Sequence, residues 1–162
     1  TVFTRENFQI PAGNKDRYEL FKERIFLAVP ADSPYASEES VRLKDFAHQD
    51  FISLSGSRSI RTICDRYCMQ AGFVPHIIYE SDSPDTVKYL IASGLGVGFW
   101  PHYTWRTDSM EQIRLMPIAE PTCQRAIILQ LHRHARVQEA VCSFYAFLNR
   151  YLRQLKAAEK TG

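Results

Sequence analysis

Residues 51–59 read F-I-S-L-S-G-S-R-S, a short apolar run followed at once by small polar residues. The apolar part, 51–54, has the length and composition of a buried strand, and Gly56 interrupts it. A helix is predicted from Arg58 to Gln70, because apolar residues recur there at three- and four-residue spacing. The stretch therefore predicts a strand-to-helix connection built from small polar side chains.

Strands and helices continue to alternate after this stretch. A strand is predicted over 76–80, then a helix from Ser83 (N-cap) and Pro84 (first turn) to about 93, and a strand over 97–100. Such an alternation predicts an α/β fold with a parallel sheet. Elsewhere the pattern predicts strands at 23–29, 114–118 and 125–132, a loop over 5–20, and helices at 41–46 and 137–155.

The small polar residues lie where an α/β sheet binds ligands, beyond the carboxyl ends of its strands. Those ends are 55–59, 81–83 and the turn after Trp100. Free N–H groups at a helix N-terminus favour an anion, Gly56 lets the backbone approach a ligand, and Arg58 could pair with a carboxylate. The alternative is an ordinary N-cap, in which one serine satisfies the first turn of the helix.

The run G-L-G-V-G at 94–98 resembles a dinucleotide-binding fingerprint only superficially. That fingerprint needs a strand before the glycines and a helix after them, and here the order is reversed. We therefore predict a helix C-cap followed by a tight turn into the next strand.

Patterns of catalysis and metal binding are absent from the sequence. It contains no H-E-x-x-H, G-x-S-x-G or Walker motif, and His132 and His134 are interpreted as a surface pair. We predict no catalytic residue, no metal and no cofactor. The cysteines are interpreted as reduced, mostly buried thiols of an intracellular protein, with a metal or redox role as the alternative; they are Cys64, Cys68, Cys123 and Cys142.

Composition and charge fit a folded module rather than a general nucleic-acid binder. The chain has 162 residues, 45% hydrophobic and 23% charged, with a net charge of +2. Residues 125–160 carry seven Lys or Arg against two Glu, which we interpret as a solvated helix face rather than a nucleic-acid contact. No apolar stretch approaches the roughly 18 residues of a membrane span, so no membrane partner is expected.

Four segments resemble LysR-type transcriptional regulators. Residues 25–36 are similar to the family's L-A-V-P-x-x-H-P-L-A segment, with Ser33 where the family often has His. Residues 41–46 resemble V-x-L-x-D-L, residues 68–75 resemble x-x-x-A-G-F-x-P, and residues 87–101 resemble V-x-x-L-V-A-A-G-L-G-V-A-L-L-P. The four occur in the family's order and spacing, and the resemblance covers about residues 20–155.

The resemblance implies the C-terminal effector-binding domain of such a regulator, N-terminally truncated. Its fold would be periplasmic-binding-protein-like (type 2), with two α/β lobes, one complete and one partial. The second lobe would be 31–118, the partial first lobe 1–30 with 119–155, and the tail 156–162 would fray. The family's N-terminal helix-turn-helix is absent, so DNA would be contacted only through that missing part. A cytoplasmic homodimer or higher homo-oligomer is expected by resemblance.

The resemblance also implies a small-molecule effector held between the lobes. A metabolite, expected to be anionic, would close them around a hinge near Val29–Pro30 and 115–121, and so control transcription. Alternatives are a free-standing periplasmic-type solute-binding protein and an enzyme that uses the 55–59 loop, although no oriented base accompanies its serines. The family's effector site maps onto Thr4, Ser55, Gly56, Ser57, Arg58, Ser59, Val97 and Phe99.

Overall fold

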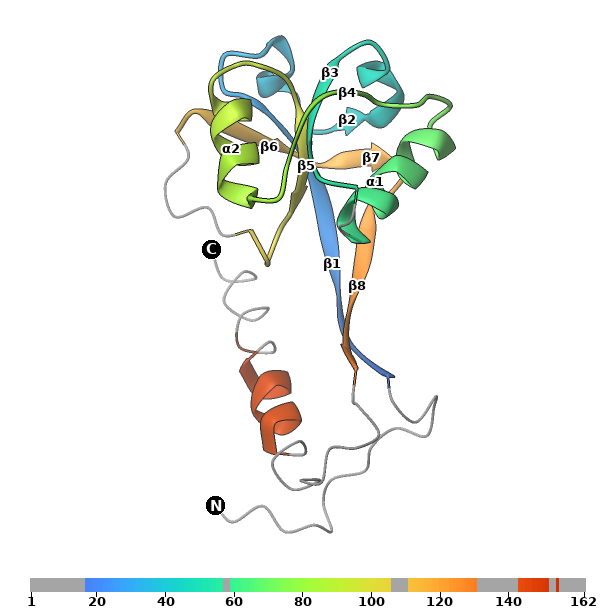
Figure 1. Cartoon of the computed structure of the whole chain (residues 1–162), viewed down its shortest axis with the longest axis vertical. Coiled ribbons are helices and arrows are strands. Elements are labelled where there is room, and N and C mark those ends of the chain that lie inside the picture. Colours follow the sequence, from blue (N-terminus) through green and yellow to red (C-terminus); the bar gives the residue numbers. More distant parts are fainter. Residues whose placement is uncertain (1–16, 57–58, 106–110, 131–142, 152–153, 155–162) are drawn as a thin grey trace. The chain divides into compact units, whose positions relative to one another are not determined.

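The computed structural model describes most of the chain (Figure 1). The described residues are 17–56, 59–105, 111–130, 143–151 and 154. The chain divides into two compact units, Lys22–Arg125 and Thr1–Phe21 with Ala126–Gly162. Both the predicted hinge segments lie within the first of these units, and the division into lobes at 30/31 and 118/119 stays a prediction.

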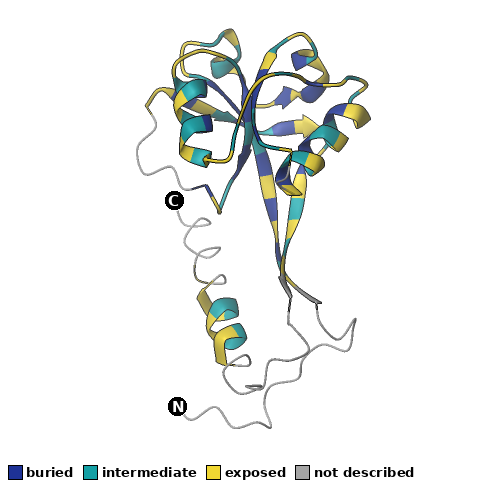
Figure 2. Ribbon diagram, in the orientation of Figure 1, coloured by how far each residue is buried: buried dark blue, intermediate teal, exposed yellow. Residues whose placement is uncertain are grey.

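The longest strand, β1 (Arg17–Pro30), organises the sheet. It pairs antiparallel with β5 (Gly98–Pro101) and with β6 (Ile113–Met116), and also pairs with β8 (Gln124–Gln130). Figure 2 shows buried and exposed residues alternating along part of β1, as expected where one face of a strand is covered, whereas Leu27, Ala28 and Val29 are buried in succession. The predicted loop over 5–20 is wrong for residues 17–20, because pairing with β8 extends the strand.

The predicted strand–helix alternation is confirmed. Parallel strands β3 (Asp50–Leu54) and β4 (His76–Ser81) are connected by α1 (Ser59–Gln70), and α2 (Pro84–Ala92) leads from β4 toward β5. Figure 1 shows α1 and α2 to either side of these strands.

The helix ends also follow the sequence prediction. Ser83 caps α2 by accepting a hydrogen bond from the Thr86 N–H. Both helices are followed by a glycine with positive φ, +94° at Gly72 and +79° at Gly94. Only glycine adopts this backbone conformation without strain, so both glycines end their helices sharply.

The glycine run enters the sheet without building a phosphate-binding loop. Val97 bridges parallel to Phe51, and β5 then pairs antiparallel with β1, so the sheet is mixed rather than purely parallel. A Cβ on Gly96 would lie 2.5 Å from the Asp50 carbonyl oxygen, and one on Gly98 would lie 2.8 Å from the Ile52 carbonyl oxygen. These glycines therefore allow the close approach of backbone to backbone in the sheet.

Two short elements differ from their predictions, namely the segments 41–46 and 114–118. The predicted helix over 41–46 is a two-residue strand, β2 (Val41–Arg42), followed by a 3-10 turn, because β2 pairs in parallel with β7 (Ile118–Glu120). The predicted strand over 114–118 is divided between β6 and β7 at Pro117, whose carbonyl accepts the Val41 N–H at 2.9 Å. A 3-10 turn also spans Pro34–Ser37.

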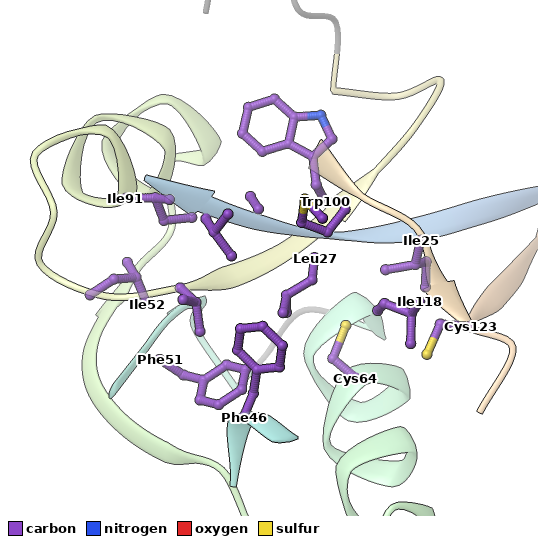
Figure 3. Packing of buried hydrophobic residues seen from close by; sticks show 14 of the residues in the cluster. Ile25, Leu27, Phe46, Phe51, Ile52, Cys64, Ile91, Trp100, Ile118 and Cys123 are labelled. Carbon is purple, nitrogen blue, oxygen red and sulfur yellow. The ribbon is translucent and has the colours of Figure 1, made fainter. Parts of the chain in front are cut away.

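The core of the Lys22–Arg125 unit packs against both faces of β1. Figure 3 shows Leu27, Phe46 and Phe51 gathered on one side of the sheet and Trp100 on the other. Trp100 is completely buried, and its indole Nε1 donates to the Trp105 carbonyl at 2.9 Å. Lys88 of α2 places its Nζ 5.2 Å from the Trp100 ring centre, a cation–π contact.

The other unit contributes a helix in its described part. Residues 143–151 are helical, within the helix predicted at 137–155, whose remaining parts lie largely outside the described residues. Phe144, Phe147 and Tyr151 are exposed on it. In the part of the chain that the structure describes, no helix is long and apolar enough to cross a membrane.

Candidate functional site

The carboxyl ends of β3 and β4 meet and bring small polar residues together. The Ser55 backbone N–H donates to the Ser81 carbonyl at 3.0 Å, and the Ser55 hydroxyl donates to Oδ1 of Asp82 at 2.5 Å. The Ser83 N–H donates to Oγ of Ser81 at 3.1 Å. Two of the three predicted ligand edges therefore form one continuous polar surface, as parallel pairing of the strands requires.

Three of the predicted binding residues in the connection from β3 to α1 are described by the structure. Ser55 is half-buried, whereas Gly56 and Ser59 are exposed, and α1 begins at Ser59. Ser57 and Arg58 lie outside the described residues, as does Thr4. Ser55 and Gly56 thus directly follow β3, and Ser59 is the first residue of α1, where N–H groups favour an anion.

Val97, which directly precedes β5, and Phe99 within β5 are the remaining described residues predicted to bind the effector. The Val97 side chain is 4% exposed, and its backbone bonds to both Asp50 and Ile52. Phe99 is half-buried, with its ring centre 5.9 Å from that of Phe51. Val97 can therefore support the site only through packing, while Phe99 reaches the wall of a small cavity.

That cavity lies under the beginning of α1. Its free volume is about 10 Å³, room for one water molecule rather than for a metabolite. It is lined by Ile52, Ser53, Leu54, Ile60, Arg61, Cys64, Val87, Phe99 and Trp105. The cavity is therefore too small for a ligand of metabolite size.

Arg61 ties α1 to β4 beside this surface. Its Nε donates to Asp65 at 2.7 Å within the helix, and its guanidinium also pairs with Glu80 of β4. The arginine side chain is 17% exposed. This pairing holds the N-terminal half of α1 against β4.

Asp82 lies just before the N-terminus of α2, where an acidic residue is favourable in any case. In the structure it places a carboxylate directly against Ser55. The site therefore combines a helix N-terminus, which favours an anion, with a carboxylate, which favours a hydrogen-bond donor. Sequence position alone could not reveal this pairing, because 27 residues separate the two side chains.

A buried ion pair was also missed by the sequence interpretation. Glu23 of β1 is 0% exposed, and its Oε2 accepts from Nε of Arg125 at 2.6 Å. Its Oε1 accepts from the N–H groups of Tyr103 and Thr104, at 2.8 and 2.7 Å. The available signal was the alternation along β1, which places Glu23 in phase with the buried Phe21, Ile25 and Leu27.

The described cysteines are buried and free, as the sequence predicted for them. Burial raises the pKa of Cys68 and of Cys123 to about 12, and raises that of Cys64 well above its ordinary value. Cys142, His132 and His134 lie outside the described residues. Within those residues no group of three or more His, Cys, Asp or Glu side chains could hold a metal ion.

These thiols should resist modification in the folded chain. In a Cys142→Ser variant at pH 8, we expect Cys64, Cys68 and Cys123 to react with a chromogenic disulfide reagent about 1,000-fold more slowly than an exposed cysteine. For Cys68 and Cys123 the reason is that a thiol with a pKa near 12 carries about a thousandth of the thiolate of one near 9, and burial also raises the pKa of Cys64. All three should react rapidly in guanidinium. A rapidly reacting equivalent in the folded variant would contradict the burial.

An α/β unit with polar residues beyond the carboxyl ends of its parallel strands has the arrangement in which open α/β sheets bind small molecules. Residues 9–153 match the LysR substrate binding domain family, and the chain belongs to this family. Among curated relatives, the Bacillus subtilis transcriptional dual regulator GltC is 26% identical over 85% of this chain and 46% of its own length. The uncharacterised regulator YybE of the same organism is 32% identical, over 67% of this chain and 37% of its own. The chain thus spans less than half the length of these relatives.

Solved structures show the same fold. The effector-binding domain of QuiR in complex with shikimate has a TM-score of 0.73 at 20% identity, covering 90% of this chain and 69% of that one. The regulatory domain of Synechocystis CcmR in complex with 2-PG has a TM-score of 0.74 at 14% identity, covering 84% and 66%. The fold class expected from the resemblance, periplasmic-binding-protein-like type 2, is confirmed. The curated relatives are transcriptional regulators. They favour the domain of such a regulator over the alternative of a free-standing solute-binding protein.

Proposed function

We propose that this chain is the ligand-sensing part of a LysR-type transcriptional regulator. The observation that carries the proposal is the position of Ser55, which directly follows β3 and is hydrogen-bonded to Ser81 and Asp82 at the carboxyl end of β4, close in sequence to Ser59 at the N-terminus of α1. Two structural neighbours bind small molecules in the corresponding type of domain. The proposed function is binding, without catalysis.

The geometry narrows the chemical class of effector that would bind at the carboxyl ends of β3 and β4. The helix N-terminus favours an anionic group, whereas the Asp82 carboxylate repels a second one and accepts hydrogen bonds. An effector that carries one anionic group, a carboxylate or a phosphate, and also a hydroxyl group meets both of these requirements. We therefore propose a small hydroxylated anion, bound with its negative group toward α1 and its hydroxyl toward Asp82.

The proposed arrangement of the whole protein follows the family. Lobe II would comprise 31–118 and lobe I would include 1–30 and 119–155, with the effector between them and a frayed tail at 156–162. Thr4, Ser57 and Arg58 would complete the site. The regulator would act in the cytoplasm as a homodimer or larger homo-oligomer. DNA would be bound through a helix-turn-helix outside these 162 residues.

Calorimetric titration with a panel of hydroxylated organic acids and phosphates, shikimate included, tests the site. We expect at least one member to bind saturably, and Ser55→Ala to weaken its binding by about tenfold, the effect of one lost hydrogen bond. Ser93→Ala is the matched control, because Ser93 is an exposed serine at the other end of α2, whose hydroxyl donates only to its own helix. Unchanged affinity in both Ser55→Ala and Ser59→Ala, or no binding across the panel, would refute the site.

A further inference from the structure

Basic and aromatic side chains gather on the face of the sheet that carries Trp100, whose position Figure 3 shows. Phe26 of β1 lies directly opposite Trp100 of β5 in the antiparallel register, so both side chains project from this face. Arg24, two residues earlier on β1, projects from the same face. The His102 N–H donates to the Arg24 carbonyl at 3.1 Å, which continues the pairing beyond the end of β5. Two segments that are distant in sequence therefore contribute to one surface.

The side chains of this surface contact one another through their rings. The guanidinium carbon of Arg24 lies 5.5 Å from the Phe26 ring centre, a cation–π contact. The His102 ring centre lies 5.0 Å from that of Phe26 and 4.9 Å from that of Tyr103. We call these four residues the Arg24 patch. Arg24 is exposed and the three rings are half-buried, so the patch presents both a positive charge and apolar ring surface to solvent.

Helix α2 contacts the same face of the sheet beside the patch. Trp100 is completely buried, with Nζ of Lys88 over its ring, whereas Arg24 is exposed and His102 half-buried. None of the patch residues lines the cavity beneath α1, and small molecules bind in concave pockets. Arginine and aromatic rings are instead enriched in protein–protein interfaces, so the patch has the composition of a surface that binds another polypeptide.

The charges of the two segments indicate which kind of partner fits. Within residues 22–30 the exposed charged side chains, Lys22 and Arg24, are both basic. The one acidic side chain of this segment, Glu23, is completely buried and ion-paired. Residues 98–105 contain no acidic residue. No carboxylate of either segment therefore neutralises the patch, and a partner that carries carboxylates complements it.

We propose that the Arg24 patch is a docking surface for an acidic segment of a partner protein, one that carries carboxylates next to apolar side chains. The planar guanidinium of Arg24 pairs with a carboxylate of that segment through two parallel hydrogen bonds. The half-buried rings of the patch contact the apolar side chains beside it. Because β1 is paired with β5 on one side and with β6 on the other, the segment lies across the face of the sheet and adds no strand to its edge.

Fluorescence polarisation with the full 162-residue chain tests this surface. The probe is a fluorescein-labelled hexapeptide in which glutamate and leucine alternate. We expect saturable binding that weakens about tenfold when glutamine replaces glutamate in the peptide, and about tenfold in an Arg24→Gln chain. Arg42→Gln is the matched control, because it removes the same charge from another exposed arginine, which pairs with Asp45. Its affinity for the acidic peptide should stay within about twofold of the unsubstituted chain.

Amide chemical shifts of the isotope-labelled, unsubstituted chain locate the bound peptide. We expect the largest changes at 24–26 and 102–104, and this map decides the question even if Arg24→Gln does not fold. Absence of saturable binding, or changes centred elsewhere, would overturn the proposal. Equal weakening by Arg24→Gln and Arg42→Gln would do so as well, since it would show only a general attraction to positive charge. Tighter binding of a single-stranded oligonucleotide than of the acidic peptide would assign the patch to nucleic acid instead.

Discussion

Glu23→Ala is expected to lower the free energy of unfolding by about 3–5 kcal/mol, the cost of breaking a buried ion pair by removing one partner. The substitution leaves the Arg125 guanidinium, whose side chain is 14% exposed, without its carboxylate. It also removes the acceptor of the Tyr103 and Thr104 N–H groups. Urea unfolding followed by circular dichroism measures the change.

Lys22→Ala is the control for this prediction. Lys22 precedes Glu23 on the same strand, and its side chain is exposed. A surface substitution in a strand changes stability by about 0.5 kcal/mol at most when no specific contact is lost. If Glu23→Ala were as mild as Lys22→Ala, the buried ion pair would have no stabilising role.

Gly98→Ala is expected to cost about 2–3 kcal/mol, because an added methyl group has no space in the sheet. The new Cβ would lie 2.6 Å from Cδ1 of Ile91 and 2.8 Å from the Ile52 carbonyl oxygen. The Ile91 side chain can rotate away, but the carbonyl belongs to the backbone of β3. Moving it disturbs the hydrogen bond that the Ile52 N–H donates to the Val97 carbonyl. Thermal and urea unfolding of the variant measure the loss.

Gly56→Ala is the matched comparison. A Cβ at Gly56 would meet nothing within 4 Å, and its φ lies outside the positive region. We expect this variant to be as stable as the unsubstituted chain or up to about 1 kcal/mol more stable, since alanine restricts the unfolded chain. Equal destabilisation by Gly56→Ala and Gly98→Ala would show that the clash at β5 is not the cause.

Elements with strong local signals could be predicted closely. The helix of 59–70 follows from its apolar spacing, and the second helix from Ser83–Pro84 at its start and Gly94 at its end. The short segment at 41–46 could not be predicted in the same way. Its first two residues form a strand only because β7, more than seventy residues later, supplies a parallel partner. A two-residue strand has no periodicity of its own to detect.

For the candidate site, the sequence predicted the loop but not its electrostatic surroundings. Gly56 and its neighbouring serines between a strand and a helix indicate a binding edge through local chemistry alone. The Asp82 carboxylate against Ser55 depends on the register in which β3 and β4 pair. That register is a property of the folded sheet, and it changes the expected effector from a simple anion to a hydroxylated one.

By itself, the sequence determined the order of the longer strands and helices, the glycine and proline positions that end several of them, and the small polar residues after β3. These properties depend on neighbours within one or two turns of chain. Only the tertiary structure decided that Glu23 is buried and what satisfies it, since Arg125 lies 102 residues away. Burial of a charge is favourable only when partners are already in place, so the fold must form before such a residue has a role.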